Sequence, residues 1–503
     1  MSKRVADENG SGPLKGGHRP DAMDIDDDDK DVGEFEDEFE DEFESEDEIF
    51  EAGVDGRPDA EREADEKAAA MEVDQGTFIV GRSKLEPGQT LAPDPTTYEM
   101  LHNLSTPWPC LSFDIVRDAL GDDRKAYPAT MYLVAGTQAE SSKASDNQLL
   151  VSKLSGLSRM ARRGDDDDGS DDDDDDDDGD DDDEDAEPIL ESRSIPLNST
   201  TNRIRAHQVP SSSSGSEPGR PPTTLTATMT ESANVFIHDV TPHLASFDNP
   251  GSGVTAQHDR PVCTIRAHKA EGYAVDWSPT VPGGRLLTGD NDGLVYATTR
   301  ADGGGWATDA RPFRGHAGSV EDLQWSPSEA SVFASASSDG TVRVWDVRSR
   351  ARRPAITVRA SAHDVNVISW SRQTSHLLAS GADDGAWAVW DLRQWKEAGG
   401  AETPQPLASF AFHTEQITSL EWHPADDSVV AVAAADSTVT LWDLAVELDD
   451  EESKDTAGVK GVPPQLLFVH YLKDAKEVHW HPQMMGSLVA TGEEFSVFRT
   501  ISV

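Results

Sequence analysis

The 503-residue sequence contains only two cysteines, Cys110 and Cys263, and therefore predicts no disulfide framework. Its longest apolar run, about Ser428–Ala435, is far shorter than the roughly 20 residues that a membrane-spanning helix needs. The first ten residues lack the apolar core of a signal peptide. These absences favour a soluble protein of a reducing compartment, which we expect to be the cytosol or the nucleus.

Sequence signatures of an active site are missing as well. There is no glycine-rich phosphate loop and no Gly-x-Ser-x-Gly nucleophile motif. No cysteine, histidine or carboxylate spacing is typical of a metal site. We therefore expect a protein that is not an enzyme, with no catalytic residue, no bound metal and no cofactor.

Basic residues are scarce relative to acidic ones. The 43 Lys and Arg against 96 Asp and Glu give a formal net charge of −53. Residues 24–51 contain 18 acids and one base, and residues 165–187 contain 19 acids in 23 positions, so these two segments account for −36 of the charge. Such a charge disfavours contact with a nucleic-acid backbone and favours a basic protein as partner.

The acidic segments cannot bury enough apolar surface to fold by themselves. We expect residues 1–90 to be a disordered acidic arm and residues 164–188 to be an extended, solvated insertion. In the arm, phenylalanines recur every four residues and would share one helix face once a basic partner neutralised the intervening acids: Phe35, Phe39 and Phe43. Plain disorder is the alternative.

A short module is expected over residues 94–120. The three-residue spacing of Tyr98, Leu101 and Leu104 after Pro95 predicts a helix. Apolar positions alternate in WPCLSFDIV, residues 108–116, which predicts a strand.

Internal repetition decides the fold class. Four blocks run from a histidine to a tryptophan, and their histidines are 48, 47 and 50 residues apart: His268, His316, His363 and His413. Each block continues into a strand pair, and three of the pairs end in Trp-Asp. This period resembles the WD repeat, which forms the four-stranded blades of a β-propeller. With two degenerate units before these blocks and one after them, we expect an all-β, seven-bladed propeller over residues 121–503, with the acidic insertion between its first and second blades.

WD repeats use a buried network of His, Ser or Thr, Asp and Trp within each blade, and the sequence contains candidates for it. The set is complete twice: His316, Ser335, Asp339 and Trp345, and His363, Ser380, Asp384 and Trp390. It is incomplete twice: His413, Asp436 and Trp442 with Val432 at the hydroxyl position, and His268, Thr288 and Asp292 with Thr298 at the tryptophan position. Because an active site is normally built once, recurrence in every blade favours a structural role over catalysis or metal binding. His479 and His481, which flank Trp480, are also expected to pack rather than to ligate a metal.

Further motifs together resemble one family. They are DPTTYEMLHNL, WPCLSFDIVRDALGDDR, YLVAGTQAE, SVEDLQWSP, HDVNVISWSR, PPQLLFVH, HWHPQ and the terminal FRTISV. From about Asp94 to Val503 the chain closely resembles the glutamate-rich WD-repeat proteins, the ribosome-assembly chaperones of eukaryotes, and is similar to their fungal members. The resemblance implies a nucleolar factor that binds the basic ribosomal protein L-three and delivers it to early large-subunit particles.

The resemblance also implies where a client binds. The segment Tyr98–Arg117 is similar to the histone-binding module of the retinoblastoma-binding WD proteins, in which a histone helix lies between an N-terminal helix and an acidic loop of the sixth blade. The matching acidic loop here covers residues 447–464. The client-binding candidates on the helix and this loop are Tyr98, Leu101, Asp449, Asp450, Glu451 and Glu452. Those in the other acidic segments are Phe35, Phe39, Phe43, Asp171, Asp175 and Asp180.

Two other functions stay open. The same surface suits a histone-binding chaperone of chromatin assembly. The endings Trp345–Arg348 and Trp390–Arg393 resemble the box by which some WD proteins join a cullin ubiquitin ligase as substrate receptors, although a basic residue that simply ends a strand explains them too. In each case we expect a monomer in the nucleus or nucleolus, with possible shuttling to the cytoplasm, without sequence-specific nucleic-acid binding and without a membrane partner.

Overall fold

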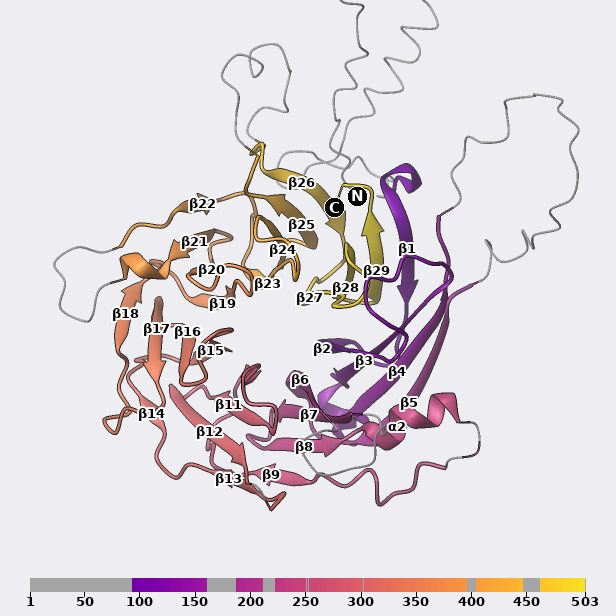
Figure 1. The fold of residues 1–503 in the computed structure, drawn as a ribbon, viewed down its shortest axis with the longest axis horizontal. Coiled ribbons are helices and arrows are strands. Elements are labelled where there is room, and N and C mark those ends of the chain that lie inside the picture. Colours follow the sequence, from indigo (N-terminus) through magenta and orange to yellow (C-terminus); the bar gives the residue numbers. More distant parts are fainter. Residues whose placement is uncertain are drawn as a thin grey trace, which may run out of the picture. The chain divides into compact units, whose positions relative to one another are not determined.

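The computed structural model describes residues 93–160, 187–210, 222–249, 251, 253–301, 303–395, 404–446 and 462–502. These residues form seven antiparallel sheets, arranged as the blades of a propeller around a central axis (Figure 1). In six sheets the first strand in sequence lies next to the axis, in the seventh β27 does, and successive innermost strands contact one another. The expected all-β, seven-bladed fold is confirmed.

The strands of each blade follow one another from the axis outward. Blade 1 contains β2 (Cys110–Val116), β3 (Ala129–Thr137), β4 (Gln148–Leu157) and β5 (Ile189–Pro196). Blade 2 contains β6 (Thr201–Val209), β7 (Thr223–Thr230), β8 (Val235–Asp239) and β9 (Cys263–Ile265). Blade 3 contains β10 (Ala274–Trp277), β11 (Arg285–Gly289) and β12 (Leu294–Arg300), with β13 (Trp306–Thr308) and β14 (Phe313–Arg314) both paired to β12.

The remaining blades follow the same order. Blade 4 contains β15 (Val320–Trp325), β16 (Val332–Ser337), β17 (Thr341–Asp346) and β18 (Ile356–Arg359). Blade 5 contains β19 (Val365–Trp370), β20 (Leu377–Ala382), β21 (Trp387–Asp391) and β22 (Ala408–Phe410). Blade 6 contains β23 (Ile417–Trp422), β24 (Val429–Ala434), β25 (Thr438–Asp443) and β26 (Leu466–Tyr471). Blade 7 contains β27 (Glu477–Trp480), β28 (Ser487–Thr491), β29 (Phe495–Thr500) and β1 (Tyr98–Leu104).

The described residues contain few helices, and none of them interrupts the ring. Three are 3-10 turns: η1 (Pro95–Thr97), η2 (Ser141–Asp146) and η5 (Leu392–Gln394). The α-helix α2 (Thr241–Asp248) lies at the outer edge of blades 1 and 2, where its Phe247 packs against Tyr132 of β3 (Figure 1).

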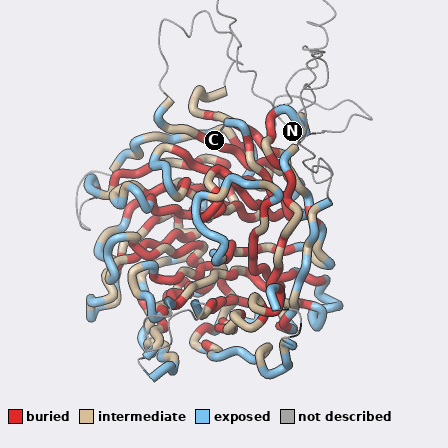
Figure 2. The backbone as a smooth tube through the Cα atoms, turned by 45° about the vertical axis from the view of Figure 1, so that its right-hand side comes forward, coloured by how far each residue is buried: buried red, intermediate tan, exposed pale blue. Residues whose placement is uncertain are grey.

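The hydrophobic core is divided among the junctions between blades. Buried residues run through the middle of the strands, and exposed residues gather at the loops (Figure 2). Large aromatic side chains fill these junctions, and seven of them are essentially inaccessible to solvent: Trp345, Trp387, Trp442, Phe113, Phe313, Phe333 and Phe498. Because every blade packs its faces against two neighbours, apolar burial stabilises the ring as a whole.

The ring is closed by two segments from opposite ends of the sequence. Strand β1 is the outermost strand of blade 7 and pairs antiparallel with β29, from Tyr98 opposite Thr500 to Leu104 opposite Phe495. The backbone N–H and C=O groups of β29 thereby gain partners on their outer side. Cutting this pairing would leave an exposed sheet edge and open the junction with blade 1.

The helix predicted from Tyr98, Leu101 and Leu104 is wrong. Tyr98, Met100 and Leu104 are buried, whereas Leu101 is only half-buried, as expected of a strand. The buried residues keep the two-residue alternation, and the apolar Leu101 on the opposite side of the strand produced the three-residue spacing in the sequence. The strand predicted for residues 108–116 is confirmed as β2, and both β1 and β2 belong to the propeller.

The predicted position of the acidic insertion is also wrong. Strands β4 and β5 pair in continuous register from Gln148 opposite Pro196 to Ser155 opposite Ile189. The segment therefore joins the third and fourth strands of blade 1 rather than two blades. Residues 161–186 of this segment, like residues 1–92 and 447–461, lie outside the described residues.

The closing strand generates a stability prediction. Met100 is 1% exposed in the core shared by blades 7 and 1, so Met100→Ala leaves a cavity and should lower the free energy of unfolding by about 2–5 kcal/mol. Leu101→Ala, on the half-buried side of the same strand, is the control and should cost less. Urea unfolding followed by tryptophan fluorescence measures both. Equal losses for the two variants would show that the strand is not packed as described.

Candidate functional site

The innermost strands are tied to one another by a repeated hydrogen bond. In four successive junctions, the residue that precedes the tryptophan of one blade accepts from the backbone N–H of the next blade's tryptophan. The pairs are Asp276 with Trp325 (2.6 Å), Gln324 with Trp370 (2.6 Å), Ser369 with Trp422 (3.2 Å) and Glu421 with Trp480 (3.0 Å). The polar residue in this position fixes the spacing of neighbouring blades, because a buried donor without a partner is costly.

The junction of blades 7, 1 and 2 contains a buried charge cluster around Glu477. The Glu477 carboxylate accepts from the guanidinium groups of Arg203 (2.6 Å) and Arg205 (2.7 Å) and from the backbone N–H of Phe113 (2.9 Å). Glu477 is only 1% exposed. Burial alone would raise its pKa, but Arg205 and Arg203 outweigh this and hold the pKa well below the usual range. One carboxylate thus links three blades.

His479, one of the two histidines that flank Trp480, extends this cluster. Its Nδ1 lies 3.0 Å from Oε2 of Glu421, and its Nε2 lies 3.7 Å from Oε1 of Glu477. Burial lowers the pKa of His479, but the two carboxylates overcome burial and raise it to about 10. Its partners are thus charged neighbours from blades 6 and 7. His481 is fully buried, and its Nδ1 accepts from the backbone N–H groups of Gln483 and Met484.

The histidine networks form in three blades. In blade 4, Trp345 donates to Oγ of Ser335 (2.8 Å), which lies 2.7 Å from Nε2 of His316. Nδ1 of His316 then donates to Asp339 (3.0 Å). Burial lowers the pKa of His316, although Asp339 acts in the opposite direction, and the chain of bonds leads from the tryptophan through the hydroxyl and the imidazole to the carboxylate.

The other networks differ from the predicted sets in identifiable ways. In blade 6, the hydroxyl comes from Thr440, which bonds both Trp442 (2.7 Å) and His413 (2.9 Å). In blade 3, His268 bonds Thr288 and Asp290, both at 2.7 Å, and the predicted Asp292 is exposed.

In blade 5, two of the four residues predicted for the network do not join it. His363 and Asp384 are both exposed, and only the bond from Trp390 to Ser380 (2.8 Å) is formed. His363 and Asp384 therefore face solvent on the loops of this blade. The regular spacing in the sequence could not reveal this, because the loop before β19 carries its histidine outward.

One face of the propeller is defined by a second repeated bond. In every blade, the loop between the second and third strands donates a backbone N–H to a carbonyl of the loop before the innermost strand. The seven pairs are Gln138 with Pro109, Glu231 with Thr200, Asn291 with Glu271, Ser338 with Ser319, Asp383 with Asp364, Ala435 with Gln416, and Glu493 with Lys473. These paired loops therefore lie together at the same end of all seven blades, and we call this surface the loop face.

The loop face is strongly acidic. It carries eleven exposed carboxylates: Glu140, Asp146, Glu231, Asp292, Asp364, Asp383, Asp384, Glu415, Asp474, Glu493 and Glu494. Its exposed Lys and Arg are five, Lys143, Arg266, Lys269, Arg359 and Lys473, and Arg359 donates to the loop carbonyls of Asp339, Ser361 and Ala362. Lys143 and Lys473 are already paired with Glu140 (3.7 Å) and Glu493 (2.8 Å). A negative field therefore covers this face.

The loops of blades 5 and 6 concentrate this charge, and the adjoining Arg359 donates to the carbonyls of Ser361 and Ala362 rather than to one of their carboxylates. Asp364, Asp383, Asp384 and Glu415 are exposed there, and these loops contain no Lys or Arg. We call these four residues the acidic arc. Exposed carboxylates accept hydrogen bonds from Lys and Arg side chains, so the arc can hold a basic segment of another protein. The arc was missed from the sequence, although the repeated loop positions of the aligned blocks contained the signal.

Most of the client-binding residues expected from the sequence lie outside the described residues: Phe35, Phe39, Phe43, Asp171, Asp175, Asp180, Asp449, Asp450, Glu451 and Glu452. Tyr98 is buried, packs edge-on against Phe468, and donates to Nδ1 of His470 (2.9 Å), whose pKa burial lowers to about 3. Tyr98 thus holds the closing strand in place and offers no surface to a client, which corrects its assignment as a contact residue. Leu101 lies on the same outermost strand, half-buried, and stays a prediction.

The arginines of the two Trp-Asp-x-Arg endings fold back onto their own blades. Arg348 pairs with Asp346 (2.6 Å) and Arg393 pairs with Asp391 (2.8 Å). Both arginine side chains are nevertheless about two-thirds or more exposed, at 73% and 67%. Their pairing with the Asp two residues earlier accounts for their position without a partner protein.

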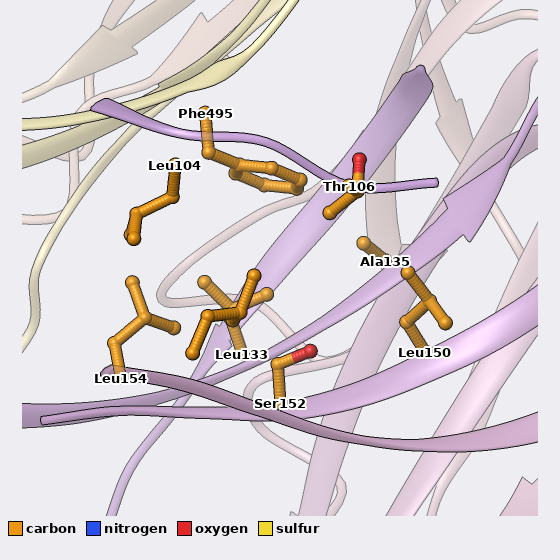
Figure 3. A pocket seen from close by; sticks show the side chains of 9 residues that line it. Leu104, Thr106, Leu133, Ala135, Leu150, Ser152, Leu154 and Phe495 are labelled. Carbon is orange, nitrogen blue, oxygen red and sulfur yellow. The ribbon is translucent and has the colours of Figure 1, made fainter. Parts of the chain in front are cut away.

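The pocket between blades 7 and 1 is apolar (Figure 3). Leu104, Leu133, Leu154 and Phe495 point into it. Its two hydroxyl groups already have partners, since Thr106 donates to the carbonyl of Trp108 and Ser152 bonds Ser192. This pocket is a packing gap at the ring closure rather than a reaction site. Among the described residues, no three His, Cys, Asp or Glu side chains are grouped to hold a metal ion, and no helix is long and apolar enough to cross a membrane.

Comparison with known proteins agrees with this geometry. A family model described as "WD domain, G-beta repeat" matches residues 308–346 and 404–443. A second model, of the "Histone-binding protein RBBP4" and its counterpart in the CAF1 complex, matches residues 88–158, which include β1 to β4. The fold, the networks and these matches define the class: a WD-repeat β-propeller.

Full-length relatives narrow the class to a family. The chain is 44% identical to "Ribosome assembly protein rrb1" of Schizosaccharomyces pombe over 507 residues, covering 100% of both chains. It is 44% identical to "Protein HEAT STRESS TOLERANT DWD 1" of Arabidopsis thaliana, covering 84% of this chain and 91% of the relative. It is 41% identical to "Glutamate-rich WD repeat-containing protein 1" of Dictyostelium discoideum, covering 84% of each. The chain belongs to this family of glutamate-rich WD-repeat ribosome-assembly proteins.

The charge cluster predicts a large loss of stability on neutralisation. Glu477→Gln leaves Arg203 and Arg205 without their anionic partner and should lower the free energy of unfolding by about 3–5 kcal/mol. Glu494→Gln, an exposed carboxylate of the same blade, should change it by less than about 0.5 kcal/mol. Chemical denaturation of the two variants and the parent measures the difference. A loss no larger than that of the control would contradict the buried role of Glu477.

Asp276 predicts a pH-dependent stability. Burial raises its pKa to about 7, although Trp325, Arg205 and Arg372 act in the opposite direction and Asp322 adds to the increase. The folded state therefore binds a proton that the unfolded state, with a pKa of about 4, has lost, so this group lowers stability as pH rises from about 4 to 7. Asp276→Asn removes the titration and should raise the melting temperature more at pH 8 than at pH 5.

Thermal unfolding at a series of pH values tests this expectation. The exposed Asp123→Asn serves as the control for a general loss of negative charge. A difference between the Asp276→Asn variant and the parent that stays constant with pH would refute the assignment.

Proposed function

We propose that the protein escorts a basic ribosomal protein of the large subunit, ribosomal protein L-three, into precursor particles in the nucleolus, as a binding protein and not an enzyme. The observation that carries the proposal is the acidic loop face, with its eleven exposed carboxylates, four of which form the acidic arc. The full-length similarity to a relative named as a ribosome assembly protein supports the cellular process. A ribosomal protein outside the ribosome is a cation without its RNA, and the loop face offers it a substitute anion.

The strength of such binding comes from number rather than from any single contact. An exposed ion pair contributes about 0–1 kcal/mol, so a single carboxylate gives no useful affinity for a client. The loop face offers eleven on one rigid surface, and the sequence adds the acid-rich segments 24–51 and 165–187. Once one contact forms, later contacts are intramolecular, at an effective concentration on the order of mM. The weak individual bonds also permit release to a denser polyanion.

A histone is the second candidate client. The match of residues 88–158 to a histone-binding family model favours it, because these residues build the closing strand and most of blade 1. Both clients are basic, so charge alone does not separate them. Competition between purified ribosomal protein L-three and histones H3–H4 for the full-length protein ranks them. Displacement of L-three by an equimolar amount of H3–H4 would reverse the order proposed here.

Neutralising the acidic arc tests the proposal. The variant Asp364→Asn, Asp383→Asn, Asp384→Asn and Glu415→Gln should weaken binding of purified L-three about tenfold at low salt, a loss of about 1.4 kcal/mol over four exposed contacts. Four exposed acids off the loop face provide a control with the same change in charge: Asp123→Asn, Glu191→Gln, Glu329→Gln and Asp427→Asn. Fluorescence anisotropy with labelled L-three, repeated over a salt series, measures both. If the arc variant and the control bind alike, the loop face is not the client surface.

A further inference from the structure

One surface of this acidic protein has the opposite charge. At the outer edge of the propeller, the loop of residues 347–355 in blade 4 lies against residues 309–314 of blade 3. These two segments and Asp346 contain six arginines and two aspartates. Each aspartate is already paired, Asp309 with Arg352 and Asp346 with Arg348. The remaining arginines, which we call the arginine rim, are exposed: Arg311, Arg314, Arg350 and Arg353.

The two segments that carry the rim are held together by specific contacts. The backbone N–H of Arg314 donates to the carbonyl of Arg352 (3.1 Å). The guanidinium of Arg352 lies over the ring of Phe313 at 4.3 Å and also pairs with Asp309. Phe313 is itself buried in the core of blades 3 and 4. Arg352 therefore acts as the anchor, and the four rim arginines project from a fixed base.

The rim arginines have no anionic partner in the described part of the chain. None of the four forms an ion pair there, in contrast to Arg348 and Arg352 beside them. Unpaired guanidinium groups gathered on one edge repel one another, and a bound anion would relieve this repulsion. Guanidinium is planar and matches the oxygens of a phosphate with two parallel hydrogen bonds.

The composition of the rim distinguishes between kinds of anionic partner. A protein partner normally buries apolar anchors at the centre of its interface. The exposed large hydrophobic residues of the described chain are all elsewhere: Leu120, Ile189, Val262, Leu407 and Ile501. The rim thus offers charge and hydrogen-bond donors with almost no apolar surface, which is what a phosphodiester backbone requires.

We propose that the arginine rim binds the phosphate backbone of RNA without sequence preference. The choice of RNA rests on the proposed function, because a ribosome-assembly factor acts on an RNA particle. The total charge of −53 does not prevent local binding. At 0.15 M salt the electrostatic potential of an exposed charge decays over a Debye length of about 8 Å. The described strands that border the acidic insertions belong to blades 1 and 6, at least two blades from the rim.

The test compares two variants of the full-length protein that differ from the parent by the same charge. The rim variant is Arg311→Ala, Arg350→Ala and Arg353→Ala, all exposed, with the anchor Arg352 intact. The control variant is Lys125→Ala, Arg260→Ala and Lys269→Ala, three exposed bases elsewhere. Binding of a fluorescein-labelled, mixed-sequence 20-nucleotide RNA is followed by anisotropy over a KCl series. Melting temperatures confirm that both variants are folded.

The expected result is specific in magnitude. Each phosphate contact on a single strand contributes about 0.7 to the slope of log K against log salt, so the rim variant should lose about 2 units of slope and the control almost none. The proposal is overturned if the rim variant keeps the parent's affinity and slope, or if the parent binds a DNA duplex of the same length but not the RNA. A gain of RNA affinity in the rim variant would also overturn it, because the rim would then hold the chain's own acidic segments.

The assay contains no client, so its outcome is independent of the client proposal. Loss of L-three binding in the acidic-arc variant with unchanged RNA binding would support both sites separately. If the acidic-arc prediction fails, the salt dependence of RNA binding still tests the arginine rim.

Discussion

The propeller depends on the hydrogen bonds that cross from each innermost strand to the next. A ring of sheets has no continuous core through its centre, so the spacing of neighbouring blades must be set by contacts at the axis as well as by the apolar junctions. The repeated acceptor before each tryptophan, from Asp276 to Glu421, supplies this contact in four junctions. At the closure, where strands from both ends of the sequence meet, Glu477 replaces the single bond by a cluster with Arg203 and Arg205.

The sequence predicted the fold well because the fold is periodic. The histidine-to-tryptophan blocks indicated the blade number, and the strand pairs indicated the order of the strands. The errors occurred where the period fails. Tyr98 to Leu104 form a lone strand whose partner, β29, is almost 400 residues away, so no local pattern could distinguish it from a helix. In blade 6, Thr440 supplies the hydroxyl that the repeat pattern places at position 432, where the chain has a valine. Only the folded structure shows that Thr440 meets His413.

The candidate binding site was harder to predict than the fold. Long acidic runs dominate the net charge, so the sequence pattern does not single out individual acids in the loops. Asp384 was interpreted through the structural network, yet it and Asp383 are both exposed on the loop face. Only the arrangement of loops from blades 5 and 6 at one end of the ring shows that these acids and Glu415 form one surface. The same holds for Arg311 and Arg353, which are 42 residues apart in sequence and lie in adjacent blades.

The arginine rim lies on blades 3 and 4 and the acidic arc on blades 5 and 6, although Arg314 of the rim, opposite Leu294, borders the loop-face turn that carries Asp292. The ring is held by buried charge pairs and inter-blade bonds, so a conformational signal between surfaces would have to break several of them at once. Direct electrostatic coupling is also weak beyond about 8 Å in cellular salt. The two proposed sites are therefore expected to bind their ligands independently, on one rigid propeller. RNA held at the arginine rim would then raise the local concentration of phosphate near a client on the loop face, and exchange from carboxylates to phosphates follows by competition. Release in this scheme needs no energy source, because the phosphate backbone carries the denser charge.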